Sequence, residues 1–426
     1  MSVYCQVEEP GPAARGDAAR STLGGIIRGL TDASMLAQPM RIGIFTSTFL
    51  PKVGGTERSV DAMARAFAAR GHDVVVITHD KHGVPEVPYP LFQFPRPRFR
   101  RRWPGVFAGP LRRAWARHRF DVLLCTNGNP TAYGAGIARK LGPRFAIVAN
   151  PRGFDLYPTN IEHMSRGWRR WTRRGYRNAD RIVAISSYMT QRLREWVGEP
   201  LPPIDLVFNG VNIEERRAAA ARAAEAFEHD QVQVARRYER LRDRRFILQL
   251  ARVEPRKRQG LVVEALARAR NRLDAVDLCY VIAGQGNAMA DVQAAIERHG
   301  LGNRVFMVGL CGEPDKSWLL ENARFMVASS IEEGMPNVVL EALAHGRPVL
   351  ASDILPHRDI LEGRACARLF RTDDRDELET QLRAMIDADH ETMSADARAA
   401  SASFSVDQMI AGYERAFERA LAERQG

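Results

Sequence analysis

Hydrophobic and polar positions follow two repeating patterns along most of the chain. Short apolar runs rich in β-branched residues, such as Arg41–Thr46 and Val74–Thr78, are typical of buried strands. Between them, Thr56–Arg70 has apolar residues at helical spacing, and Gly71 stands where a helix C-cap is expected. A strand, the Gly-rich turn Pro51–Gly55, a helix and a second strand predict a right-handed βαβ unit in a parallel sheet.

The alternation continues in two series. Further strands of the first series are expected at Asp121–Cys125, Phe145–Ala149, Arg181–Ile185 and Ile204–Phe208. Strands of the second are expected at Phe246–Leu250, Leu278–Ala283, Val305–Val308, Phe325–Ala328 and Pro348–Ala351, with helices from Gln259 and at Met289–His299, Ser317–Asn322 and Pro336–His345. The polar stretch Glu214–Arg244 predicts one long helix. Two such series predict an α/β protein with two doubly wound, Rossmann-like domains.

The limits of these domains follow from the turn signal Asn209-Gly210. We expect an N-terminal domain at 40–208 and a second domain at 209–405, followed by an amphipathic helix at 406–424. Residues 1–39 are rich in Gly, Ala, Pro and Arg without a period. They are interpreted as a disordered tail, with Met40 as an alternative start.

Composition narrows the class of protein. The 426 residues are 45% apolar and 27% charged, which excludes fibrous, disordered and disulfide-framework proteins. The five cysteines are scattered, and none has zinc-site or redox spacing, so we expect reduced thiols and a cytoplasmic location. No apolar run approaches the ~18 residues of a membrane span, and we expect no secretion signal.

The net charge of +11 points to an anionic partner, and it is localised. Val87–Phe120 holds nine arginines and no acid, and His163–Ala179 holds six arginines and no acid. The six, from Arg166 to Arg177, form one stripe on a predicted helix, opposite Met164, Trp168, Trp171 and Gly175. Arg96–Arg119 and Arg166–Arg177 are therefore candidates for an anionic membrane surface. The alternative is a solvated surface whose tryptophans enter the core.

Three glycine-rich or basic turns follow predicted strands. Gly54 and Gly55 precede the first helix, where backbone amides can approach a phosphate, although a plain tight turn explains them equally. Arg252 and Lys257 follow the first strand of the second series, where ligands of such sheets bind, and two cations there can hold a diphosphate. Gly284 and Gly286 end another strand of that sheet. The alternative for the cations is an ordinary solvated pair.

The segment Glu333–Glu341 is the most informative. It places Glu333, Gly334 and Met335 ahead of a helix that opens at Pro336 and Asn337, and Glu341 within that helix. Two acids near one crevice can accept hydrogen bonds from the hydroxyls of a sugar nucleotide. The alternative is one capping acid and one solvated acid.

These motifs resemble, in order, those of the retaining glycosyltransferases of family 4. The resemblance rests on Pro51–Glu57, Asn209-Gly210-Val211-Asn212, Arg252 with Lys257, Gly284-Gln-Gly286, and Glu333–Glu341 followed by Ala342–Val349, and it covers residues 40–424. It implies the GT-B fold, in which two Rossmann-like domains face each other across a cleft. It further implies that the second domain binds the donor and that the C-terminal helix crosses back to the first.

The resemblance also implies roles for individual residues. Arg252 and Lys257 would clamp the donor diphosphate, Glu333 would contact the donor sugar, and Glu341 the ribose. Gly54 and Gly55 would approach the donor from the first domain. The cations and helix dipoles would stabilise the leaving diphosphate, so no metal and no other cofactor are expected.

The sequence departs from the family pattern at three positions. Ala251 replaces the usual Gly before Arg252, and Asn212 replaces the usual Asp. The usual His after the fourth strand is missing from Ala149–Asp155, where Arg152 occupies the neighbourhood. An arginine cannot act as a base, but it can orient a sugar or a phosphate.

Together with this resemblance, the sequence predicts a metal-independent, retaining hexosyltransferase that uses a UDP- or GDP-sugar, with catalytic residues Glu333, Arg252, Lys257 and Arg152; retention is implied by the resemblance alone. Its acceptor would be a lipid-linked glycan or an envelope polysaccharide precursor, met at the inner face of the cell membrane. One alternative is a catalytically inactive sugar-nucleotide binder, prompted by the missing His. Another is a nucleic-acid-binding protein, prompted by the arginines and aromatics. We expect no nucleic acid partner, since the glutamate pair has no role in binding one.

Overall fold

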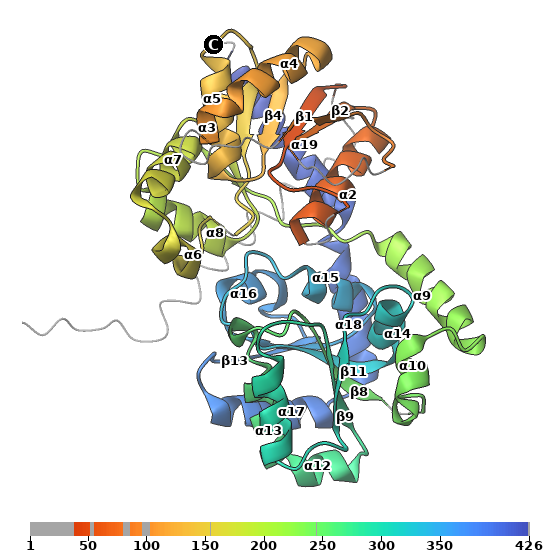
Figure 1. Ribbon diagram of the computed structural model, residues 1–426. Coiled ribbons are helices and arrows are strands. Elements are labelled where there is room, and N and C mark those ends of the chain that lie inside the picture. The colour runs from red at the N-terminus through yellow and green to blue at the C-terminus, as the bar shows by residue number, and fades with distance from the viewer. Residues whose placement is uncertain are drawn as a thin grey trace, which may run out of the picture. The chain divides into compact units, whose positions relative to one another are not determined.

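The computed structural model contains two parallel β-sheets (Figure 1) and describes residues 38–51, 55–79, 86–95, 103–153, 155–243 and 245–424. Met40–Gly426 forms one compact unit. The predicted tail, Gly54 and the arginines from Arg96 to Arg102 lie outside the described residues, except Gln38 and Pro39 at the end of the tail. The domain limit at 208/209 stays a prediction.

The first sheet has the strand order β3-β2-β1-β4-β5-β6-β7, all parallel. Its strands are β1 (Arg41–Phe45), β2 (Asp73–Thr78), β3 (Leu91–Gln93), β4 (Val122–Cys125), β5 (Ala146–Ala149), β6 (Arg181–Ala184) and β7 (Ile204–Leu206). The predicted strands of the first series are confirmed, and β3 was not predicted. β3 is a three-residue edge strand of half-buried residues, too short for a recognisable pattern.

The second sheet has the order β10-β9-β8-β11-β12-β13, again all parallel. Its strands are β8 (Phe246–Leu250), β9 (Cys279–Ala283), β10 (Val305–Gly309), β11 (Ala323–Ala328), β12 (Val349–Ser352) and β13 (Ala367–Phe370). The predicted strands are confirmed here as well. β13 was not predicted, because this edge strand is interrupted by the exposed Arg368 and lacks a continuous apolar run.

Helices connect the strands of both sheets, and the linker between the sheets, residues 207–212, follows β7. Those up to the linker are α2 (Gly55–Ala69), α3 (Trp103–Val106), α4 (Ala108–His118), η3 (Gly128–Ala132), α5 (Tyr133–Arg139), α6 (Pro158–His163), α7 (Arg166–Arg177), α8 (Ser187–Arg192) and η4 (Leu193–Val197). Those after it are α9 (Ile213–Glu228), α10 (Gln233–Arg237), η5 (Glu239–Leu241), η6 (Pro255–Lys257), α11 (Gln259–Arg268), α12 (Arg270–Ala275), α13 (Met289–Arg298), α14 (Asp315–Asn322), α15 (Asn337–Ala344), α16 (Leu355–Leu361), α17 (Arg375–Asp387), α18 (His390–Ala402) and α19 (Val406–Ala422).

The single long helix predicted for Glu214–Arg244 is wrong. α9 ends at Glu228, and Asp230 adopts a left-handed backbone with φ of 54°. The chain then turns so that Val232, Val234 and Ala235 are buried in the core. Burial of these apolar side chains decides the break, since the Ala/Arg/Glu composition alone favours a continuous helix.

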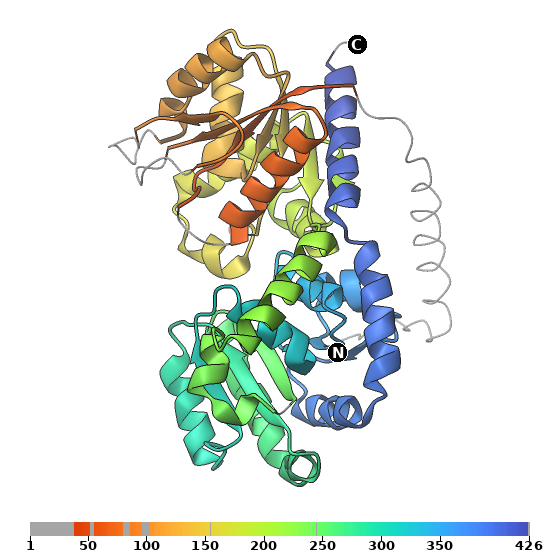
Figure 2. The ribbon, with the colours of Figure 1, turned by 90° about the vertical axis from the view of Figure 1, so that its right-hand side faces the viewer.

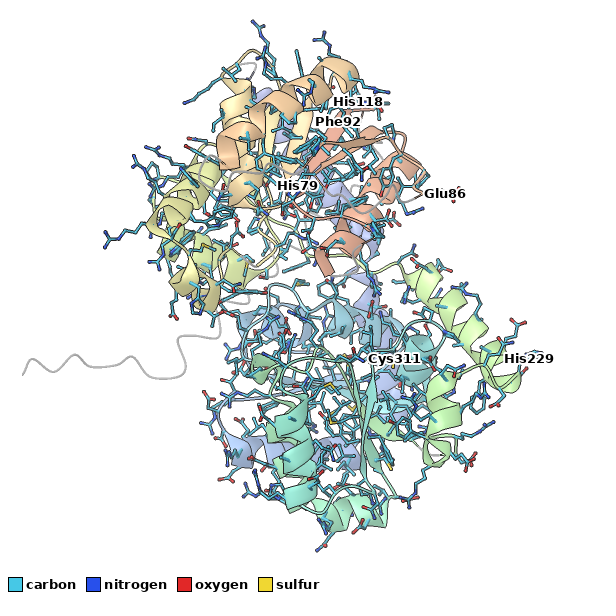
Figure 3. The ribbon with its side chains drawn as sticks, in the orientation of Figure 1. His79, Glu86, Phe92, His118, His229 and Cys311 are labelled. Carbon is cyan, nitrogen blue, oxygen red and sulfur yellow. The ribbon has the colours of Figure 1, made fainter. Side chains whose placement is uncertain are left out.

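The helices of the first sheet lie on two faces. Chain connections run one way from β1 to β2 and the other way from β4 to β7, so right-handed crossovers place α2 on one face and α4, α5 and α7 on the other. α5 contacts both α4 and α7. At the far edge of this face, the ring of Phe92 on β3 contacts that of His118 at the end of α4, with 6.3 Å between ring centroids (Figure 3).

The C-terminal helix α19 packs on α2 and on the strands of the first sheet (Figure 2). Its Glu414 is buried and forms an ion pair with Arg70 at 2.8 Å, and it also contacts the buried ring of His72 at 2.8 Å. A chain that has completed the second sheet thus returns to the first, as the family resemblance implies.

Helix α7 turns its predicted non-arginine face toward the core, rotated somewhat toward Thr172 and Tyr176. Thr172, Gly175 and Tyr176 are buried, Trp168 packs partly against the core, and Trp171 is only half-buried. Gly175 lies so close to the η3 turn that a Cβ there would be 1.7 Å from the Gly128 carbonyl oxygen. The turn after β4 is therefore seated directly on the arginine helix.

Gly175→Ala should destabilise the protein, because the new methyl group collides with a backbone carbonyl that cannot move freely. We expect a loss of about 1–3 kcal/mol in the free energy of unfolding, typical of overpacking, measured by urea denaturation. Gly167→Ala in the same helix is the control, since a Cβ there meets nothing within 4 Å. Equal stabilities for the two variants would contradict this packing.

Candidate active site

Both sheets reverse the direction of their connections at one point, and ligands of open α/β sheets bind at the carboxyl ends of the strands on either side of it. In the first sheet that point lies between β1 and β4, and in the second between β8 and β11. Arg252 and Lys257 follow β8, and Glu333 follows β11. The predicted donor residues therefore lie at the reversal point of the second sheet.

The loops after β8 and β11 are hydrogen-bonded to each other. The carbonyl of Lys257 accepts hydrogen bonds from Gln249 Nε2 at 3.0 Å and from Ser329 Oγ at 2.7 Å. The amide of Ile331 donates to the carbonyl of Arg256 at 2.9 Å. These contacts hold the two loops in one arrangement before any ligand is bound.

Lys257 and Glu333 form a buried ion pair between Nζ and Oε1, and each side chain is 11% exposed. Ser330, which the sequence did not single out, donates to the same carboxylate oxygen at 2.7 Å. Burial by itself raises the pKa of Glu333, but the charge and hydrogen bond of Lys257 and the bond from Ser330 outweigh it, so the pKa lies below its usual value. Glu333 is therefore ionised, and the lysine charge is neutralised.

Arg252 occupies a different environment. Its side chain is 67% exposed and pairs with Glu254 at 2.5 Å. An ion pair of an exposed arginine is weak, so Arg252 can readily exchange Glu254 for another anion. Of the two cations that the sequence singled out on this loop, Lys257 is buried and compensated, and Arg252 is exposed.

Gly284 and Gly286 pack closely against the backbone of the loop that carries Arg252. A Cβ at Gly284 would lie 1.9 Å from the Ala251 carbonyl oxygen, and one at Gly286 would lie 2.1 Å from that of Val253. The backbone of Gly284 also has φ of +149°, which glycine favours. Close packing on the Arg252 loop explains both glycines, and their contact with a donor stays a prediction.

Glu341 on α15 is held by a lysine that the sequence did not single out. Lys316 Nζ on α14 lies 2.6 Å from Glu341 Oε1. The other oxygen, Oε2, is buried and has no hydrogen-bond partner among the described residues. A carboxylate oxygen without a partner is suited to accept a hydrogen bond from a ligand hydroxyl.

The segment between the two glutamates faces the loop after β5. A Cβ at Gly334 would lie 3.3 Å from the Arg152 carbonyl oxygen and 3.1 Å from the Tyr157 hydroxyl. Met335 is buried, and Pro336 precedes the first residue of α15, Asn337. The glycine permits this close approach. Gly55, at the start of α2, has open space around its Cβ position.

At its reversal point, the carboxyl edge of the first sheet carries neutral polar groups. Asn127 Nδ2 after β4 lies 3.5 Å from Ser47 Oγ after β1, so the contact spans the reversal point. Asn129 is 3% exposed, and neither atom of its side-chain amide has a partner among the described residues. None of these residues was predicted, because isolated Asn and Ser carry no pattern.

Arg152 lies at the end of β5, where sequence comparison with the family pattern placed it. Its Nη1 donates to Asn150 Oδ1 and to Asn209 Oδ1, each at 3.2 Å, and its Nη2 donates to Ser59 Oγ on α2. No carboxylate pairs with it within the described part of the chain. Burial lowers its pKa below the usual value, but a guanidinium stays charged at neutral pH.

The described residues offer neither a cluster of metal ligands nor a membrane-spanning helix. They contain no group of three or more His, Cys, Asp or Glu that could hold a metal ion. They also contain no helix long and apolar enough to cross a membrane.

Two parallel Rossmann-like sheets, with a C-terminal helix that returns to the first sheet, are the architecture of the GT-B glycosyltransferases. The family profiles "Glycosyltransferase Family 4" and "Glycosyl transferases group 1" match residues 53–215 and 230–401. The chain belongs to these family 4, group 1 glycosyltransferases.

Among similar proteins, N-acetyl-alpha-D-glucosaminyl L-malate synthase of Bacillus anthracis is 23% identical over 329 residues, covering 74% of this chain and 79% of that protein. The GDP-mannose-dependent alpha-mannosyltransferase of Mycobacterium tuberculosis is 26% identical over 344 residues, covering 76% and 81%. The crystal structure of HepE from Anabaena in complex with UDP and glucose has a TM-score of 0.69 at 19% identity, covering 89% of this chain and 99% of that one.

Glu333→Gln should leave the Lys257 charge buried without a counter-charge, which costs about 3–5 kcal/mol of stability at neutral pH. Because folding depresses the carboxyl pKa, the wild-type advantage is present above the usual value of 4.5 and disappears as the pH falls through the lower folded-state pKa. Urea unfolding at a series of pH values measures this. Glu214→Gln, in the exposed pair with Arg217, should cost less than about 1 kcal/mol, and a pH-independent difference for Glu333→Gln would refute the assignment.

Proposed function

We propose that this protein is a retaining hexosyltransferase that moves one sugar from a UDP- or GDP-sugar to a hydroxyl of a lipid-linked glycan or an envelope polysaccharide precursor. The observation that carries the proposal is the buried Lys257–Glu333 pair at the reversal point of the second sheet. A relative named for GDP-mannose and a structural neighbour that binds UDP and glucose support a nucleotide-sugar donor.

The donor residues have distinct tasks in this proposal. Arg252 and Lys257 bind the diphosphate and stabilise the charge that develops on it as the sugar leaves, so no metal is required. Glu333 orients Lys257 and accepts hydrogen bonds from the donor sugar. Glu341 accepts a ribose hydroxyl at its unused Oε2.

The acceptor binds at the neutral edge of the first sheet, around Ser47, Asn127 and Asn129. In the reaction, the bond between the sugar C1 and the phosphate oxygen breaks, and a bond from C1 to the acceptor oxygen forms on the same face. The acceptor proton passes to the departing phosphate oxygen. The protein then needs no base, which suits the presence of Arg152 where the family has His.

The same substitution favours a second candidate, a binder of sugar nucleotides without transferase activity. It shares the donor site and differs only in turnover. Release of UDP or GDP from a nucleotide sugar in the presence of a cell-envelope extract separates the two.

We further propose that α4 and α7 contact an anionic membrane surface, which places the protein at the inner face of the membrane. Six exposed arginines on these helices have side chains that form no ion pair or hydrogen bond with the described residues: Arg112, Arg113, Arg117, Arg166, Arg170 and Arg174. The other arginines of the α7 stripe have structural roles. Arg173 and Arg177 bind the carbonyls of Trp196 and Val197, and Arg169 binds that of Met164.

A nucleotide sugar should raise the melting temperature, because it binds the folded state alone. We expect a shift with at least one member of a panel of UDP-, GDP- and ADP-sugars. Arg252→Gln should weaken that binding by roughly tenfold or more, the value of a charge-assisted hydrogen bond, and leave the unliganded protein equally stable. Arg298→Gln, an exposed arginine of the same sheet's helices, is the control. The donor proposal fails if no nucleotide sugar shifts the wild type.

Flotation with lipid vesicles tests the membrane proposal. The wild type should float with phosphatidylglycerol vesicles at low salt and stay behind with neutral ones. Replacing Arg166, Arg170 and Arg174 by Gln should lower the affinity on the order of 100-fold, at about 1 kcal/mol per arginine. A control with Arg222, Arg237 and Arg298 replaced loses the same charge elsewhere and should still float. Equal binding to neutral and acidic vesicles would exclude this surface.

A further inference from the structure

Arg152 is the centre of a hydrogen-bonded network that reaches the donor loop. Its guanidinium donates to Asn209 Oδ1 at 3.2 Å, and Asn209 Nδ2 donates to Asn337 Oδ1 at 2.8 Å. Asn209 lies in the linker between the two sheets and is 5% exposed. Asn337 is the first residue of α15, four residues after Glu333. Two consecutive hydrogen bonds therefore join the end of β5 to the donor loop.

The chemistry of Arg152 sets the direction of every bond in this network. A guanidinium has only N–H donors, so the amide of Asn209 must turn its oxygen toward Arg152. Its nitrogen then faces Asn337, which must present its own oxygen in return. The Nδ2 of Asn337 is left over, and it has no hydrogen-bond partner among the described residues. A residue that can also accept a hydrogen bond, such as a neutral His, would leave the direction of these hydrogen bonds undetermined.

The surroundings of Arg152 favour this positioning role over a direct charge role. The guanidinium is also held by Ser59 on α2 and by Asn150, whose own orientation is fixed because its Nδ2 donates to the Val183 carbonyl at 2.7 Å. The Tyr413 hydroxyl on α19 lies beside the same guanidinium but outside hydrogen-bonding geometry. A cation fastened to neutral groups from several elements is poorly placed to swing toward a substrate.

We propose that Arg152 is a positioning residue that, through Asn209, fixes the side chain of Asn337 so that its Nδ2 donates a hydrogen bond to an oxygen of the bound sugar nucleotide. The inference rests on the proposed function, since it assigns one contact within that donor site. The oxygen belongs either to the diphosphate or to the sugar. A diphosphate oxygen and the ring oxygen of the sugar can only accept, so either one requires a donor at this position and would be repelled by an amide oxygen.

Asn209→Asp is the most direct test. The new carboxylate still accepts from Arg152 but cannot donate to Asn337, so Asn337 must turn its Nδ2 toward that carboxylate and its oxygen toward the ligand. We expect the affinity for the preferred nucleotide sugar to fall at least tenfold by isothermal titration. The melting temperature of the unliganded protein should stay equal or rise, because the new carboxylate pairs with Arg152.

Companion variants isolate the direction of the bonds. Asn337→Asp keeps the contact with Asn209 but presents an oxygen to the ligand, and should lose the same affinity. Lysine, like arginine, can only donate, so Arg152→Lys should retain more affinity than Arg152→Gln. The glutamine can also accept a hydrogen bond, which leaves the amide of Asn209 free to turn round. Asn212→Asp is the matched control, because this exposed linker residue caps α9 through its Oδ1, which a carboxylate also provides.

The outcomes are distinguishable. If the affinity for UDP or GDP alone falls as much as that for the nucleotide sugar, the contacted oxygen is on the diphosphate. If only the affinity for the nucleotide sugar falls, the oxygen is on the sugar. Unchanged or tighter binding by a stable Asn209→Asp protein overturns the inference and leaves the donor site intact. A wild type that binds no nucleotide sugar overturns the proposed function and this inference together.

Discussion

The chain passes between its two sheets twice, and the two passages are hydrogen-bonded to each other. The amide of Val211 donates to the carbonyl of Phe404 at 2.7 Å, and that of Val406 donates to Val211 at 3.3 Å. A Cβ at Gly210 would lie 2.6 Å from the Val406 Cα, so only glycine permits this approach. Because the linker residue Asn209 is adjacent, the same constraint brings Arg152 and Asn337 within reach of one amide.

The carboxyl edges of the two sheets differ in how their charged groups are compensated. The edge of the second sheet buries opposite charges that neutralise each other, Lys257 with Glu333, and keeps an exposed arginine beside them. The edge of the first sheet has amides and hydroxyls, with Arg152 as a cation held by neutral groups. A diphosphate suits the former and a sugar hydroxyl the latter. The proposed division between a donor edge and an acceptor edge thus has an electrostatic basis.

Much of the fold could be predicted because buried parallel strands are continuous apolar runs. The edge strands β3 and β13 were not predicted, since half-buried residues interrupt such runs. The predicted helix at Glu214–Arg244 failed because composition does not reveal where Val232 and Val234 must be buried. For the candidate site, Lys257 and Glu333 were predicted from their residue types and their positions after strands, and then from the family resemblance. Their direct pairing, and the parts played by Ser330, Lys316 and Asn129, depend on contacts between residues far apart in the chain.

The sequence by itself determined the two series of strands, the arginine-rich segments and the positions of the donor motifs, because each is written in local spacing and residue type. The tertiary structure decided which charges are compensated and which polar groups are left without partners. It showed that Gly284 and Gly286 serve backbone packing, that half of the α7 arginines bind carbonyls, and that Arg152 is joined to Asn337. These depend on distances between segments separated by up to hundreds of residues, which no local pattern encodes.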